Sequence, residues 1–371
     1  MRYGRWCRVG AGILALVICH SSALAQAPAA GEVTRRSRTL QAIAPVSSTQ
    51  KYREALNQNT ITIVSGNPNG TYLALAYDMS AVLDNGNDLR VLAVIGKGGA
   101  QNVRDILHLR GVDMGITQAT VMARFKQTGE LGAGIDQRLA YITQLYNEEM
   151  HILAGPGIER IKDLDGKKVN FSDVGSGTQF TTRLVFESLG IKPIEVNMGQ
   201  ADAYQQVKSG GLAATVLIAG KPAGSFSKFK LEGGMRLLPV AYEQALQKDY
   251  LPAKLTHKDY PGLIAEGKEI ETIAVSSVLA VYNWPKNTDR YRRVAQFVDQ
   301  FFTKLPEFHK GPRHPKWLET SLTATLPGWT RFPAAQEWID NAKAKLPPPT
   351  RDASKSVLAI DVDLARMQAA A

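Results

Sequence analysis

Two segments of this chain repeat one order of features: a short β-branched or apolar run, a glycine-rich turn, and apolar residues at helical spacing. In the first, TITIVSG (60–66) leads into GNPNGTY and a helical pattern that Asp84 ends. In the second, KKVNFS (167–172) leads into DVGSGT and a helical pattern that Gly190 ends. Strands that alternate with helices predict a parallel sheet with right-handed crossovers. We therefore expect an α/β fold with two such units.

Further strands extend each unit, and two long strand-like runs (139–155 and 271–284) connect them. We expect lobe 1 to contain residues 60–150 and 272–341, and lobe 2 to contain residues 151–271. A helix with Val294, Phe297, Val298 and Phe301 on one face should follow the second connection. The further strands are expected at LRVLAVIG (89–96), VDMGITQ (112–118), IEVNM (194–198) and LAATVLIAG (212–220).

The glycine-rich turns do not match the known nucleotide loops. Three residues lie between Gly66 and Gly70, where a Walker A loop has four, and no lysine precedes Thr71, so the turn is not a Walker A loop. No G-x-G-x-x-G occurs there either. A helix start still attracts anions, because its first amides lack partners and the helix dipole is positive there. Ligands of open parallel sheets bind beyond the carboxyl ends of the strands, where these turns lie. Two such units that face each other predict an anion clamp; the alternative for each turn is a plain strand-to-helix connection.

The N-terminus has the three-part layout of a secretory signal peptide. MRYGRWCR is basic, an apolar run follows from Val9 to Cys19, and small residues stand at Ala23, Ala25 and Ala27. We expect residues 1–25 to be cleaved after Ala25 and the protein to be periplasmic. Residues 26–59 read as a linker with a short helix, and residues 342–371 as a flexible tail.

Composition excludes several classes of function. Both cysteines, Cys7 and Cys19, lie in the expected signal peptide, which excludes disulfides and thiolate chemistry in the mature chain. Removal of three arginines leaves 41 − 34 = +7 formal charges. The basic residues are spread along the chain without an aromatic-basic motif, so we expect no nucleic-acid partner. No metal-binding or G-x-S-x-G motif occurs, so neither a metal, a cofactor nor catalysis is expected.

From about Thr60 to Asn341 the chain resembles the TAXI (TRAP-associated extracytoplasmic immunogenic) family of TRAP-transporter solute-binding proteins. The resemblance is carried by four motifs in this order: GNPNGTY, KGGAQN, GITQA and VGSGT. The resemblance implies a two-lobed periplasmic-binding-protein-like (type II) fold with a hinged cleft. It also implies capture of a small organic anion or amino acid and its delivery to a TRAP-type membrane permease. A periplasmic sensor subunit is the alternative, and a hydrolase is a third possibility.

The resemblance and the turn positions together nominate a ligand-binding set. Thr71 and Ser176 offer hydroxyl groups beside helix amides, although each could only cap its helix. Lys97 and Lys221 would make the cleft cationic and favour a ligand with several negative groups, unless both are solvated surface lysines. The full set is Asn69, Gly70, Thr71, Tyr72, Lys97, Gly98, Gly99, Asn102, Gln118, Ser176, Gly177, Thr178 and Lys221.

Overall fold

A computed structural model describes residues 47–345, except 69 and 87. The expected signal peptide, Asn69 and the chain beyond residue 345 lie outside the described residues. The helices are α1 (Ser48–Gln58), α2 (Tyr72–Leu83), α3 (Gly99–His108), α4 (Ala119–Thr128), α5 (Ile135–Arg138), α6 (Gly177–Ser188), α7 (Gln200–Lys208), α8 (Asp289–Thr303), α9 (Leu305–Phe308) and α10 (Pro333–Ala344). The strands are β1 (Thr60–Val64), β2 (Arg90–Val94), β3 (Met114–Gln118), β4 (Leu139–Ala154), β5 (Lys168–Asn170), β6 (Ile194–Val196), β7 (Ala214–Ala219), β8 (Arg236–Leu237), β9 (Leu251–Thr256) and β10 (Glu269–Tyr282).

The two ends of the described chain refine two expectations. Helix α1 occupies the segment expected to be a linker with a short helix, and Ser47 caps it by accepting a hydrogen bond from the Gln50 amide. Helix α10 continues to Ala344, so the first residues of the segment expected to be a flexible tail are helical. Among the described residues, no helix has both the length and the apolar character needed to cross a bilayer.

The described strands form one ten-stranded sheet with the order β2-β1-β3-β10-β4-β7-β5-β6, to which β8 is added beside β4 and β9 beside β10. The β2-β1-β3 group is parallel, as is the β7-β5-β6 group. Strands β4 and β10 are antiparallel to their neighbours. We call the part around β1–β3 lobe 1 and the part around β5–β7 lobe 2; this confirms the two-lobed α/β fold.

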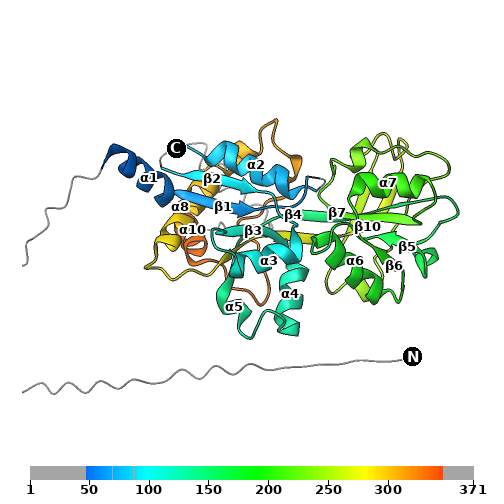
Figure 1. Ribbon diagram of the computed structural model, residues 1–371, viewed down its shortest axis with the longest axis horizontal. Coiled ribbons are helices and arrows are strands. Elements are labelled where there is room, and N and C mark those ends of the chain that lie inside the picture. The colour runs from blue at the N-terminus through cyan, green and yellow to red at the C-terminus, as the bar shows by residue number, and fades with distance from the viewer. Residues whose placement is uncertain (1–46, 69, 87, 346–371) are drawn as a thin grey trace, which may run out of the picture. The chain divides into compact units, whose positions relative to one another are not determined.

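The two long strands pass from one lobe into the other (Figure 1). In lobe 1, Ala140 of β4 pairs with Val281 of β10; in lobe 2, Glu149 of β4 pairs with Ala219 of β7. Strand β4 forms within the first run that the sequence marked as a connection, and β10 covers most of the second but begins two residues earlier, at Glu269. Because each strand is continuous, bending of β4 and β10 is the simplest hinge between the lobes.

Each lobe has its own apolar core. In lobe 1, Val294, Phe297, Val298 and Phe301 of α8 are all buried, which confirms the expected apolar face. The core of lobe 2 packs apolar side chains of α6 against all-buried β7. Separate cores allow each lobe to stay rigid while the two move relative to each other. The exact lobe boundaries stay a prediction.

Candidate functional site

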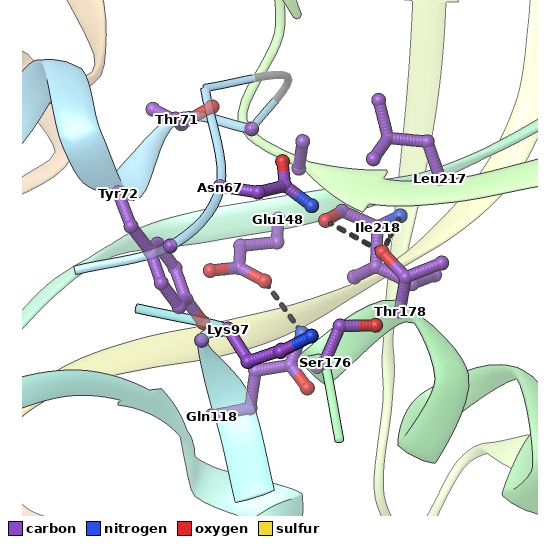
Figure 2. A pocket seen from close by; sticks show the side chains of 15 residues that line it. Asn67, Thr71, Tyr72, Lys97, Gln118, Glu148, Ser176, Thr178, Leu217 and Ile218 are labelled. Atoms are coloured by element: carbon purple, nitrogen blue, oxygen red, sulfur yellow. Dashed lines mark hydrogen bonds between the residues drawn. The ribbon is translucent and has the colours of Figure 1, made fainter. Parts of the chain in front are cut away.

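Three helix starts meet at one small cavity between the lobes. Helix α2 begins at Tyr72 and α3 at Gly99 in lobe 1, and α6 begins at Gly177 in lobe 2. Figure 2 shows the side chains of both lobes around this cavity. It is lined by Gly66, Asn67, Gly70, Thr71, Tyr72, Lys97, Gly98, Gln118, Glu148, Ser176, Gly177, Thr178, Leu217, Ile218 and Ala219.

The cavity is small. Its volume is about 30 Å³, which holds about two water molecules. A ligand as large as an amino acid therefore requires the lobes to separate. The structure thus presents the lobes in a closed arrangement.

Hydrogen bonds join the lobes at the glycine-rich turns. The Asn67 side-chain amide donates to Asp173 Oδ2 at 2.5 Å, and the Gln101 amide donates to the Gly175 carbonyl at 3.1 Å. Asp173 precedes the glycine-rich turn of lobe 2 and therefore contacts lobe 1. These bonds require closed lobes, because each has one partner in each lobe.

Glycine is required where α3 meets α6. Gly99 has a positive φ of 45°, and a Cβ atom there would lie 2.3 Å from the Gly177 Cα atom. A Cβ atom on Gly177 would in turn lie 2.9 Å from the Gln118 side chain. Any side chain at Gly99 would therefore block the close approach of the lobes. Gly99 contacts the opposite turn and is not among the lining residues.

The two predicted hydroxyl groups behave differently. Thr71 Oγ1 donates to the Gly220 carbonyl of lobe 2 at 3.1 Å and makes no capping bond to α2. Ser176 Oγ caps α6 by accepting from the Gln179 amide at 3.1 Å. A hydroxyl that accepts one bond can still donate another, so Ser176 can donate to a ligand in the closed form. Thr71 uses its proton to join the lobes.

Glu148 is the feature that the sequence analysis missed. This β4 residue is 1% exposed and lines the cavity, and its Oε2 accepts a hydrogen bond of 2.6 Å from Gln118 Nε2. The Tyr146 hydroxyl donates to Oε1 at 3.3 Å. Burial raises the pKa of Glu148 to about 8, although the bond from Gln118 opposes the rise. Glu148 is therefore mostly uncharged at neutral pH in the ligand-free closed form.

The Tyr72 hydroxyl is an unsatisfied polar group at the same cavity. Tyr72 is 7% exposed, and its hydroxyl makes no hydrogen bond of acceptable geometry to another described residue. Burial and the nearby Glu148 carboxyl raise its pKa well above the usual value. In Figure 2 the Tyr72 ring and the Glu148 carboxyl approach each other at the cavity. The Tyr72 hydroxyl therefore adds a further buried polar group next to Glu148 at this cavity.

Gln118 and Asn102 hold the surrounding turns in place. Gln118 Oε1 accepts from Thr181 Oγ1 of lobe 2 at 2.8 Å, while its Nε2 donates to Glu148, so both ends of the amide are occupied. The buried Asn102 Nδ2 donates to the carbonyls of Val64, Ser65 and Ile116, and its Oδ1 accepts from the Gly98 amide. Asn102 therefore ties together the loops that shape the site and does not line the cavity.

The two predicted lysines do not meet. Lys97 is exposed and lines the cavity. Lys221 Nζ instead donates to the Lys254 carbonyl at 2.7 Å and pairs with Asp259 at 3.1 Å within lobe 2. The expectation of a pocket with two lysines is wrong for this structure, because Asp259 holds the Lys221 side chain away from the cavity. Lys97 is the only cation among the lining residues.

Other lining residues also escaped the sequence analysis. Leu217, Ile218 and Ala219 end β7 and supply the apolar wall of lobe 2. The Thr178 hydroxyl accepts a 3.0 Å bond from the Ile218 amide and so fixes α6 to this strand. The end of a buried strand beside a glycine-rich turn is the one sequence signal that could have identified them.

The described residues provide little for catalysis. No group of three or more His, Cys, Asp and Glu among them could hold a metal ion. Ser176, the one possible nucleophile of the turn, has only the Gln179 amide as the recorded partner of its hydroxyl. A serine nucleophile requires an adjacent base.

Comparisons with known proteins identify the family. One similar solved structure is a periplasmic transporter, with 13% sequence identity and a TM-score of 0.46 over 77% of this chain and 93% of that chain. A second is the periplasmic aliphatic sulphonate binding protein SsuA from Escherichia coli, with 16% identity and a TM-score of 0.38 over 83% of this chain and 86% of that chain. A third is the ligand-binding component of an ABC-type import system from Staphylococcus aureus with zinc bound, with 13% identity and a TM-score of 0.42 over 79% of this chain and 95% of that chain. Residues 63–320, more than half of the 371, match the family described as NMT1-like. The chain therefore belongs to the NMT1-like family.

Proposed function

We propose that this protein is an extracytoplasmic solute-binding receptor that encloses a small carboxylate-bearing ligand, an organic acid or an amino acid, between its lobes. One observation carries the proposal: three helix starts from both lobes converge on one cavity. Helix starts favour negative charge, and a closing cleft removes it from water.

The binding cycle follows from the closed contacts. Separation of the lobes breaks the bonds of Thr71 to Gly220 and of Asn67 to Asp173 and opens the cavity. A ligand that contacts both lobes then favours closure, because its contacts are complete only in the closed form. Lys97 would neutralise part of the ligand's charge. Delivery to a TRAP-type permease after cleavage of the signal peptide completes the proposed role, and it rests on the TAXI resemblance.

A thermal-shift screen of the mature protein against amino acids, monocarboxylates and dicarboxylates tests the proposal. With a ligand found there, we expect Thr71→Ala combined with Ser176→Ala to weaken binding at least about tenfold. Ser176 would lose its hydrogen bond to the charged ligand, about 1.5–3 kcal/mol, and Thr71 would lose the bond to Gly220 that joins the lobes. The matched control is Ser80→Ala with Ser209→Ala, which removes two hydroxyls that do not line the cavity. Equal affinity of the two double variants would remove Thr71 and Ser176 from the site.

A further inference from the structure

Glu148 places an acidic group where the proposed function places an anion. Its carboxyl group lies in the cavity wall, and the groups nearest to it are uncharged: Gln118 and Tyr146, which donate to it, and the Tyr72 hydroxyl. The titratable groups around it are Tyr72 from α2, Tyr146 and Glu149 from β4, and Lys97 from the loop after β2. The lining residues of lobe 2 carry no titratable group.

Two carboxylates cannot both be ionised in such a cavity. In a buried site, like charges at close range raise the pKa of one group until it takes up a proton. The alternative is that Glu148 stays ionised and binds a positive charge of the ligand, such as an ammonium group, while Lys97 faces the ligand carboxylate. The surroundings of Glu148 decide between these two arrangements.

The surroundings of Glu148 favour a protonated carboxyl group over an ionised one that binds an ammonium group. Gln118 Nε2 already donates to Oε2, and Tyr146 donates to Oε1. An ammonium group carries three donors and needs acceptors, whereas the lysine and the helix amides at this cavity are donors. A protonated carboxyl group has one O–H donor, which a ligand carboxylate can accept. A protonated Glu148 would then be one more hydrogen-bond donor to the ligand, beside the lysine and the helix amides.

We propose that Glu148 is the specificity-determining residue of this cleft: it is protonated when a ligand carboxylate is bound, donates that proton in a hydrogen bond, and so couples anion capture to proton uptake. This inference rests on the proposed function. The proton comes from solvent and forms an O–H bond at the carboxyl oxygen that faces the ligand; no other bond forms or breaks.

The expected pH dependence follows from linkage between proton and ligand. Burial raises the pKa of Glu148 to about 8 before any ligand enters. Below pH 7 the proton is already present, so affinity should not depend on pH. Above pH 8 the free protein has lost the proton and must regain it on binding, so affinity should fall up to about tenfold per pH unit.

Isothermal titration calorimetry with succinate and glutamate as probes, at pH 6, 7, 8 and 9, tests the coupling. We expect wild-type affinity for succinate to be about tenfold lower at pH 9 than at pH 7. Titrations at pH 9 in two buffers of different ionisation enthalpy should show close to one proton taken up per ligand. Glu148→Gln should lose the pH dependence of the affinity and take up no proton. Glu187→Gln, which changes an exposed carboxylate of α6, is the matched control and should behave like wild type.

Other outcomes would overturn the inference. A wild-type affinity that is constant from pH 6 to 9 would show that no proton accompanies the ligand. Loss of glutamate binding by folded Glu148→Gln at every pH, with no succinate binding to wild type, would show that an ionised Glu148 binds the ligand ammonium. If wild type binds neither probe at pH 6, the proposed carboxylate receptor fails, and the inference with it.

Discussion

Replacing Glu148 with glutamine should change how the free energy of unfolding depends on pH, without any ligand. Burial raises the pKa of Glu148 from 4.5 to about 8 in the folded protein. Between these values the unfolded chain is ionised at this residue while the folded protein keeps the proton. A raised folded-state pKa gives stability that is fully present below pH 4.5 and is lost as pH rises towards 8.

The size of the effect follows from the same shift. One pH unit corresponds to about 1.4 kcal/mol of unfolding free energy for one proton. Between pH 5.5 and 7.5, wild type should therefore lose about 3 kcal/mol through Glu148. Glutamine has the shape of the protonated acid and does not titrate. Glu148→Gln should gain about 3 kcal/mol relative to wild type over this interval, and the gain should stop growing above pH 8.

Urea denaturation followed by circular dichroism at pH 5.5, 6.5 and 7.5 measures this difference. Glu149, whose pKa burial also raises, to about 7, is present in both proteins, so its contribution largely cancels. Glu187→Gln should unfold in parallel with wild type at each pH. A constant free-energy difference between wild type and Glu148→Gln would show that Glu148 ionises normally in the folded protein, and would refute the burial argument.

Two further substitutions test closure and the buried ion pair beside the cavity. Gly99→Ala should weaken ligand binding more than about tenfold, because its Cβ atom would collide with Gly177 and keep the lobes apart. Small-angle X-ray scattering should then show no ligand-induced compaction. The control Gly111→Ala also changes a glycine at positive φ, but one in open space, and its lobes should close normally. Lys316→Met should lower the unfolding free energy at pH 8 by about 3–5 kcal/mol, because Glu149, 2.6 Å from Lys316 Nζ, loses its buried cation. Urea denaturation measures this loss of unfolding free energy. Adding Glu149→Gln to Lys316→Met should recover most of the lost stability. If the double variant recovers none, Lys316 stabilises the protein by packing alone.

Much of the fold could be predicted because local signals agree with the tertiary structure. Strand β7 is a continuous apolar run and is buried along its whole length, and the apolar face of α8 repeats at helical spacing. Strand β9 gave no such signal, because it contains Pro252 and is largely exposed. An exposed strand at the edge of a sheet needs no apolar pattern, and proline is tolerated there.

The site was only partly predictable, for a different reason. A glycine-rich turn before a helical pattern is a local signal for the start of a helix. The helix starts at Gly98 and Gly177 could therefore be identified from the sequence alone. Lys221 could not be placed, because its side chain is held by Asp259, 38 residues further along the chain. No local pattern encodes such a pair, and the spatial neighbours of a long, flexible lysine are set by the tertiary fold.

Glu148 shows how a hinge strand can hide a functional group. Two adjacent acids in a strand would normally suggest that at least one faces water, since buried carboxylates are rare. Here β4 passes between the lobes, so both acids are buried. Glu149 forms an ion pair with Lys316. Glu148 instead contacts Gln118 of lobe 1 and lines the cavity, to which lobe 2 also contributes residues. In the closed arrangement these surroundings bury Glu148 and so raise the pKa of its carboxyl group.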